Sequence, residues 1–246
     1  MAAAGSIAGI VIGSFVAAAT LRWPEGRSIV AGRSHCDHCN TALAPRDLVP
    51  IVSFIVLRGR CRHCRQPIAP RHLAIEFVAG VIGGVSLWTA PGLAGVAGAV
   101  FGWLLLALLV LDVEHFWLPN RLTLPLAVLG LAAGIWLPPA LADRVIGGIA
   151  GFASLAIIAA AYKALTGRIG LGGGDPRLFG AIGAWLGWFA LPFVLLLAAV
   201  LGLALVGYDR FSGQIITRHS RVPLGALLAA AAWGMWLAGP LTAWQR

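Results

Sequence analysis

Two aspartates stand where long apolar runs meet polar sequence, and they are the residues best suited to carry out chemistry. Asp112 closes the apolar run 92–111, and Asp175 follows the glycine-rich segment 170–174 at the start of another apolar run. Ionisable groups at membrane depth are costly to keep, so each is a candidate functional residue. In a pair that shares one proton, one Asp acts as general base on a water while the other, protonated, polarises a scissile carbonyl. The pair therefore predicts aspartic-protease chemistry.

Three glycines, Gly172, Gly173 and Gly174, directly precede Asp175. They weaken a helix and would let water and an extended substrate backbone approach the carboxylate. A phosphate-binding loop is excluded, because no Gly-Lys-Ser/Thr follows and no strand precedes the segment. The competing interpretation is that both aspartates cap helices at the membrane interface, with Asp175 as the N-cap of the next helix.

Other acids outside residues 22–72 are interpreted without a direct role in catalysis. Asp143 beside Arg144 and Asp209 beside Arg210 are expected to be solvated loop charges. Glu76 lies near the start of an apolar run, where we expect it either to pair with an Arg or to serve as an accessory functional residue.

The four cysteines form two pairs, Cys36-x2-Cys39 and Cys61-x2-Cys64, separated by 21 residues. This spacing is typical of two knuckles that hold four thiolates around a structural Zn²⁺. About 50 loop residues cannot bury enough apolar surface to fold alone, so a metal would supply the missing stability. Two disulfides are disfavoured by a cytoplasmic location, and a redox pair needs no second CxxC. The neighbouring His35, His38 and His63 are expected to be incidental.

The composition places these residues in a membrane protein. Of 246 residues, 59% are hydrophobic and 11% are charged, which is too apolar for an ordinary soluble core. A transmembrane helix needs about 20 apolar residues. By that rule we predict an all-α polytopic membrane protein with about eight spans, at 2–21, 73–90, 92–111, 118–137, 140–162, 177–190, 191–208 and 222–241.

The basic residues set the orientation of these spans. With the N-terminus outside, every Lys and Arg except Arg144 and Arg246 falls on the cytoplasmic side, as the positive-inside rule requires. Because they lack interleaved aromatic residues and gather in one loop, the +9 net charge does not indicate a nucleic-acid partner. We interpret residues 1–21 as a retained first helix, 22–72 as a small cytoplasmic zinc-binding domain between helices one and two, and 73–246 as the membrane core. Membrane lipids are the expected surroundings.

An ordered set of motifs resembles the type IV prepilin peptidase family, the bifunctional leader peptidases and N-methyltransferases of pilus and type II secretion systems. The shared residues cover nearly the whole chain and are Gly13-Ser14-Phe15, both CxxC pairs, Leu48-Val49-Pro50-Ile51-Val52-Ser53, Arg58-Gly59-Arg60-Cys61, Glu76, Leu111-Asp112, Gly172-Gly173-Gly174-Asp175, Gly183-Ala184-Trp185-Leu186-Gly187 and Val222-Pro223-Leu224-Gly225. The GxGD element alone would also be similar to presenilin-like intramembrane proteases.

The resemblance implies an aspartic endopeptidase of the bacterial inner membrane, with Asp112 and Asp175 as its catalytic pair and prepilins or pseudopilins as its substrates. It also implies S-adenosylmethionine as methyl donor, with Gly59 and Arg60 in the region associated with methyl transfer. The chain departs from the family at Asn120 and Arg177, where Asp and Lys are usual, and at Ala226, where a Pro-Phe-Gly-Pro segment ends in Pro. The first two changes preserve polarity or charge.

Two other functional classes fit parts of the pattern. One is a zinc-dependent membrane sensor or scaffold in which the aspartates only cap helices. The other is an ion transporter that uses Asp112 and Asp175 as cation ligands. Loss of leader cleavage on changing either aspartate would exclude both, and ion flux sensitive to the same changes would favour the transporter.

Overall fold

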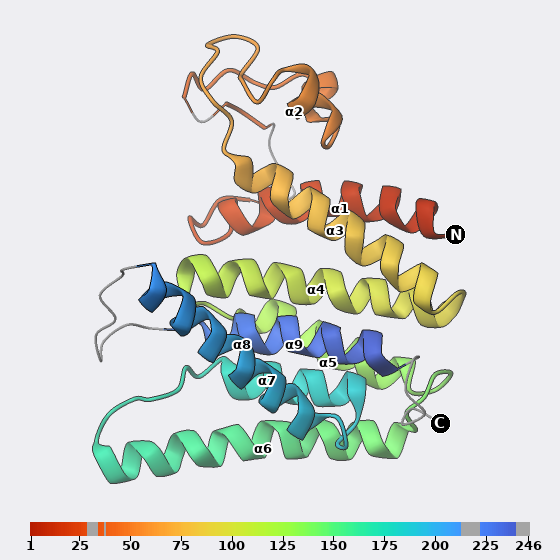
Figure 1. Ribbon diagram of the computed structural model, residues 1–246, viewed down its shortest axis with the longest axis vertical. Coiled ribbons are helices and arrows are strands. Elements are labelled where there is room, and N and C mark those ends of the chain that lie inside the picture. The colour runs from red at the N-terminus through yellow and green to blue at the C-terminus, as the bar shows by residue number, and fades with distance from the viewer. Residues whose placement is uncertain (29–33, 37, 213–221, 240–246) are drawn as a thin grey trace. The chain divides into compact units, whose positions relative to one another are not determined.

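The structure is a computed structural model and describes residues 1–28, 34–36, 38–212 and 222–239. Throughout these residues the regular elements are helices (Figure 1). They are α1 (Ala2–Arg22), the 3₁₀ turn η1 (Pro45–Leu48), α2 (Val52–Val56), α3 (Pro70–Thr89), α4 (Leu93–His115), α5 (Asn120–Ala133), α6 (Leu141–Thr166), α7 (Asp175–Leu186), α8 (Leu191–Phe211) and α9 (Leu224–Ala238). The chain forms two compact units, Met1–Trp103 and Leu104–Arg246, and each is described by itself.

Five of the described helices, α1, α3, α4, α6 and α8, are long and apolar enough to cross a membrane. Together they confirm an all-α polytopic membrane fold. Each of the eight expected runs contains a helix, but α5 and α9 have only 14 and 15 residues and α7 has 12. A 12-residue helix is about 18 Å long, shorter than the ~30 Å hydrocarbon core. The count of eight full spans therefore stays a prediction.

In the first unit, α1 packs against α3 through small residues (Figure 1). A Cβ added at Gly5 would lie 2.4 Å from the carbonyl oxygen of Gly83, and one at Gly9 would lie 2.1 Å from that of Ala79. The four-residue spacing places these glycines on one face of α1, where their missing side chains let the two backbones touch. This close packing holds together the two helices that flank the cysteine-containing segment.

In the second unit, glycines likewise bring α6 and α7 into contact. A Cβ at Gly147 would lie 2.5 Å from the carbonyl oxygen of Gly183, and one at Gly151 would lie 2.7 Å from that of Phe179. The two helices are antiparallel, and 11 of the 12 residues of α7 are buried. Such burial explains why α7 can be short, because protein rather than lipid surrounds it.

This packing also fixes where α7 begins along α6. Since Gly151 faces Phe179, Asp175 at the start of α7 is level with about Leu155, and α6 continues for roughly 16 Å beyond that level to Thr166. Asp175 therefore lies well along the length of α6 rather than level with its end. Residues 167–174 return the chain from the end of α6 to this depth.

Asp143 and Asp209, which were expected to be solvated loop charges, lie in the first turn of α6 and the last turn of α8. Arg144 belongs to α6, is only 3% exposed, and donates to backbone carbonyls at 2.8 Å from Gly130, 2.8 Å from Pro138 and 3.0 Å from Pro139. Asp143 accepts a hydrogen bond from the Trp188 indole at 3.0 Å. These backbone carbonyls solvate the buried Arg144 guanidinium as water would. Arg246 and residues 240–241 of the last expected span lie outside the described residues.

Candidate functional site

Asp112 lies in the last turn of α4 and is 5% exposed. Its Oδ2 accepts a hydrogen bond of 2.8 Å from the backbone N–H of Ala226, at the start of α9. A Cβ at the adjacent Gly225 would lie 2.9 Å from this same oxygen, so only glycine leaves room for the carboxylate there. In the sequence, Gly225 and Ala226 stand out only as part of a motif. Their partner is more than a hundred positions away, and no local pattern signals it.

Asp175 is the first residue of α7 and is 8% exposed. Its Oδ2 accepts a hydrogen bond of 3.0 Å from the backbone N–H of Gly172 in the preceding loop. An N-cap carboxylate instead accepts from an N–H two or three residues ahead within its helix. The capping interpretation therefore does not describe Asp175, whereas Asp112 does satisfy a free N–H in the first turn of another helix, α9.

The fold brings the two carboxylates near each other. Leu118, which follows α4, packs against a glycine beside each carboxylate. A Cβ at Gly174 would lie 2.7 Å from Cβ of Leu118, and a Cβ at Gly225 would lie 2.7 Å from Cδ1 of Leu118. Gly174 directly precedes Asp175 and the Gly225 position lies against Asp112 Oδ2, so Leu118 packs beside both carboxylates. Two buried carboxylates that lie near each other cannot both ionise cheaply, so this arrangement is compatible with a proton-sharing pair, which stays a prediction.

The three glycines before Asp175 have different surroundings. Gly172 donates the hydrogen bond to the carboxylate, and a Cβ there would lie 3.1 Å from Oδ2. Gly174 is pressed against Leu118. A Cβ at Gly173 would meet no described atom within 4 Å. Of the three positions, Gly173 is the one that borders the open space expected for an approaching substrate backbone.

The predicted accessory residues fall into two places. Arg177, in the first turn of α7, donates a hydrogen bond of 2.7 Å to the side-chain oxygen of Asn120 at the start of α5. The two departures from the family pattern thus contact each other. Glu76 belongs to the first unit, where its Oε2 accepts a hydrogen bond of 2.8 Å from the backbone N–H of Ile51.

Gly59 and Arg60 shape the turn before the second cysteine pair. Gly59 has a φ of +66°, in the left-handed region that glycine adopts without strain, and its carbonyl accepts from the N–H of Ile68 at 2.7 Å. Arg60 is exposed and forms an isolated β-bridge with Pro67. Both residues therefore support the cysteine knuckle.

The four cysteines converge as predicted. Within the described residues, the sulfurs of Cys36, Cys39, Cys61 and Cys64 all lie within 4.8 Å of one another, and the Sγ atoms of Cys36 and Cys64 are 3.8 Å apart. Tetrahedral Zn²⁺ with Zn–S bonds of about 2.3 Å would place its sulfurs about 3.8 Å apart. The donor set and its spacing therefore fit a structural zinc ion.

The two knuckles have the same local backbone geometry. The N–H of Cys36 donates to Thr41 and that of Cys61 donates to Gln66, each across five residues. Each knuckle then turns through a residue with positive φ, Asn40 at 54° in the first and Arg65 at 57° in the second. This repetition explains how two short CxxC segments present their sulfurs to one point.

Comparisons with known proteins agree with this geometry. Residues 7–90 match the bacterial peptidase A24 N-terminal domain, and residues 99–207 match the type IV leader peptidase family. The chain is 38% identical to a prepilin leader peptidase/N-methyltransferase of Aeromonas hydrophila, over 84% of this chain and 71% of that protein. It is 42% identical to one of Burkholderia pseudomallei, over 84% and 67% of the two chains. No solved structure matched significantly. The chain therefore belongs to the type IV leader peptidase family.

Proposed function

We propose that the protein is an aspartic endopeptidase that removes the leader peptide of prepilins or pseudopilins at the cytoplasmic face of the bacterial inner membrane. The observation that carries the proposal is the buried pair of Asp112 and Asp175. The relatives named as prepilin leader peptidases support the substrate class. Prepilins present a cleavage site just before an apolar helix, which suits a site built among membrane helices.

The two aspartates can supply the general base and the hydrogen-bond donor that peptide hydrolysis needs. One Asp, ionised, takes a proton from a water whose oxygen adds to the scissile carbonyl carbon. The other, protonated, donates a hydrogen bond to the carbonyl oxygen. The C–N bond then breaks as the leaving amine accepts a proton, so that a new N-terminus and a leader carboxylate form. The backbone N–H groups of Ala226 and Gly172 hold one oxygen of each Asp and leave the other for this chemistry.

The transporter alternative is less compatible with these contacts. A backbone N–H directed at a carboxylate oxygen points a positive dipole toward any cation bound at that carboxylate. Both aspartates have such a donor. The sensor or scaffold alternative rested on capping roles for both aspartates, which the hydrogen bond of Asp175 to the preceding loop does not support.

The proposal includes N-methylation of the new N-terminus, which the full names of the relatives support. S-adenosylmethionine would supply a methyl group activated by its positively charged sulfur. The cysteine cluster would hold one structural Zn²⁺, whose four thiolate ligands leave no open position for catalysis. This zinc-binding segment, residues 22–72, would lie on the cytoplasmic side.

Substitution of each aspartate by asparagine tests the peptidase. Asp112→Asn and Asp175→Asn keep the side-chain size but remove the ionisable group, so leader cleavage of a membrane-embedded prepilin should fall by at least a hundred-fold while the protein still folds. Asp209→Asn, which changes an acid in the last turn of α8, should cleave at the parent rate. Near-parent cleavage by Asp112→Asn or Asp175→Asn would remove that residue from the mechanism, and ion flux lost in the same variants would favour a transporter.

A further inference from the structure

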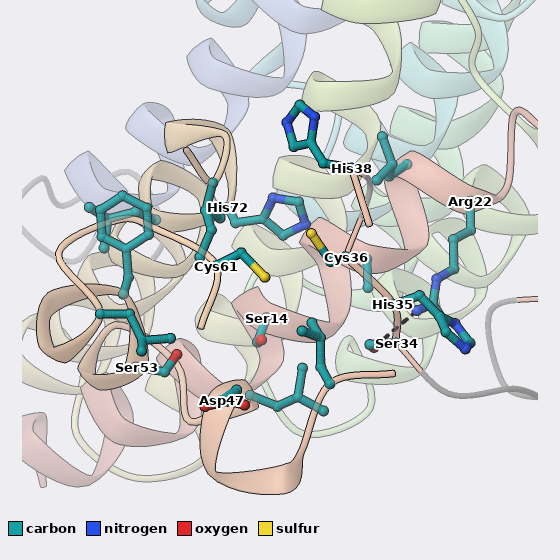
Figure 2. A pocket seen from close by; sticks show the side chains of 18 of the residues that line it. Ser14, Arg22, Ser34, His35, Cys36, His38, Asp47, Ser53, Cys61 and His72 are labelled. Atoms are coloured by element: carbon teal, nitrogen blue, oxygen red, sulfur yellow. Dashed lines mark hydrogen bonds between the residues drawn. The ribbon is translucent and has the colours of Figure 1, made fainter. Parts of the chain in front are cut away.

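The first unit contains a cavity that the proposed peptidase chemistry does not use. Its volume is about 870 Å³, and α1, α3 and the segment between them line it (Figure 2). Small-molecule sites typically measure about 300–1,000 Å³ and combine apolar walls with a few polar groups. This cavity has both, since Phe15, Phe54 and Leu57 line it together with Arg22 and Glu76.

Charges of both signs are fixed around the cavity. Arg22 donates a hydrogen bond of 3.0 Å to the Ser34 hydroxyl, as Figure 2 shows. Asp47 accepts from Arg62 at 2.7–2.8 Å, and this guanidinium lowers the pKa of Asp47 below its ordinary value. The lining therefore presents the hydrogen-bonded guanidinium of Arg22 and, elsewhere in the same wall, the ion pair of Asp47 and Arg62. Such a lining suits a zwitterionic ligand better than a purely anionic or cationic one.

Glu76 is a buried acid of the cavity wall, with 7% of its surface exposed. Its Oε2 accepts from the N–H of Ile51, and Ile51 is its hydrogen-bond partner among the described residues. Ile51 has a φ of 60°, which is strained for a β-branched side chain. On the other side of Glu76, a Cβ at Gly13 would lie 2.7 Å from its Cα, so glycine is required for this approach of α1. The surroundings thus fix the Glu76 carboxylate at the cavity wall.

We propose that this cavity binds S-adenosylmethionine, with the Glu76 carboxylate as the counter-ion of its sulfonium. The inference rests on the methylation half of the proposed function and adds the place where the methyl donor binds. The donor carries an ammonium, a carboxylate, a positively charged sulfur and a flat adenine ring. The cavity offers a guanidinium at Arg22 for the carboxylate, an enclosed carboxylate at Glu76 for the sulfonium, and apolar walls at Phe54 and Leu57 for the adenine.

Ligand binding tests this assignment without relying on turnover. Equilibrium dialysis of the detergent-solubilised full chain should give a lower Kd for S-adenosylmethionine than for S-adenosylhomocysteine, whose sulfur is neutral. In Glu76→Gln the side-chain oxygen can still accept from Ile51, but the charge is gone. We expect its affinity for S-adenosylmethionine to fall at least ten-fold while its affinity for S-adenosylhomocysteine changes less than three-fold. Glu114→Gln, the matched change in α4, should bind both ligands as the parent does.

A second variant tests the cavity itself. Ala18 lines the cavity from α1, and Ala18→Phe should fill part of it and weaken both ligands at least ten-fold. Parent-like binding by Ala18→Phe would overturn the assignment to this cavity. An equal loss of both ligands in Glu76→Gln would overturn the counter-ion role of Glu76. If the parent chain binds neither ligand but cleaves prepilin, the methylation half of the proposed function fails and the peptidase half stands.

Discussion

At the scale of single residues, the chemistry of the site depends on how each carboxylate is held. Asp112 is oriented by a backbone N–H from the start of α9, and the room for its oxygen exists because residue 225 has no side chain. A mispositioned catalytic group loses much of its advantage, because effective molarity falls steeply with small displacements. Gly225 should therefore matter to turnover although it contributes no reactive group.

We expect Gly225→Ala to lower kcat/KM for leader cleavage at least ten-fold. The new Cβ would lie 2.9 Å from Oδ2 of Asp112 and 2.7 Å from Cδ1 of Leu118, so the carboxylate must move. Helix propensity alone would make this variant more stable than the parent, because Ala within a helix is favoured over Gly by up to about 1 kcal/mol. Steady-state cleavage assays and thermal melts would separate the two effects.

Gly234→Ala is the matched control for this change, because it lies in the same helix and its added Cβ would meet only Leu197 Cδ2 at an ordinary 3.6 Å. It should cleave at the parent rate. Equal rates for the two alanine variants would show that the fit of Gly225 against Asp112 has no catalytic consequence.

Residue types and spacing indicated the candidate reactive groups but not the hydrogen-bond partners of these groups. Asp112, Asp175 and the four cysteines stand out because carboxylates in apolar sequence and paired CxxC motifs are rare and chemically specific. The donor to Asp112, the contact between Asn120 and Arg177, and the carbonyl shell of Arg144 join segments far apart in sequence. Backbone N–H and C=O groups are present at every residue, so the sequence does not mark which of them will bind a side chain.

At the scale of elements, hydropathy predicted where helices occur better than how long they are. The expected starts of α1, α6 and α8 agree with the structure to within one residue. The expected span 118–137 corresponds to the 14-residue α5, and 177–190 to the 12-residue α7. A hydropathy run measures apolar length whether lipid or protein surrounds it, so it does not distinguish a buried short helix from a full span.

The cysteine knuckles are the elements whose stability should depend on metal. We expect one Zn²⁺ per purified chain, measured by elemental analysis. Cys61→Ser should lose it, since three thiolates hold the ion less tightly than four. Without the metal the knuckles have little core of their own, so trypsin should cut faster at exposed Arg58 and Arg60, while helical circular dichroism stays close to that of the parent.

His63→Ala is the control for the zinc experiment, because His63 is exposed and lies between the ligands Cys61 and Cys64 without belonging to the sulfur cluster of the described chain. It should keep one zinc per chain. Absence of zinc from the parent protein, or cysteines recovered as disulfides, would contradict the structural metal site.

At the scale of the whole molecule, the two proposed chemistries draw on different parts of the chain. The carboxylate pair and its backbone donors all belong to residues 104–246, whereas the cysteine cluster and the cavity with Glu76 belong to residues 1–103. The boundary between the units falls inside α4. Each chemistry should therefore be removable by a point substitution that leaves the residues of the other unchanged.

We expect Asp175→Asn to abolish leader cleavage but to methylate a synthetic peptide that already carries the mature N-terminus. The substrate amine of such a peptide is free without prior hydrolysis, and no residue that lines the S-adenosylmethionine cavity is altered by the change. Mass spectrometry should show one added methyl group at a rate within three-fold of the parent protein. If the parent methylates this peptide and Asp175→Asn does not, both activities depend on the carboxylate pair, and the division of chemistry between the two units is wrong.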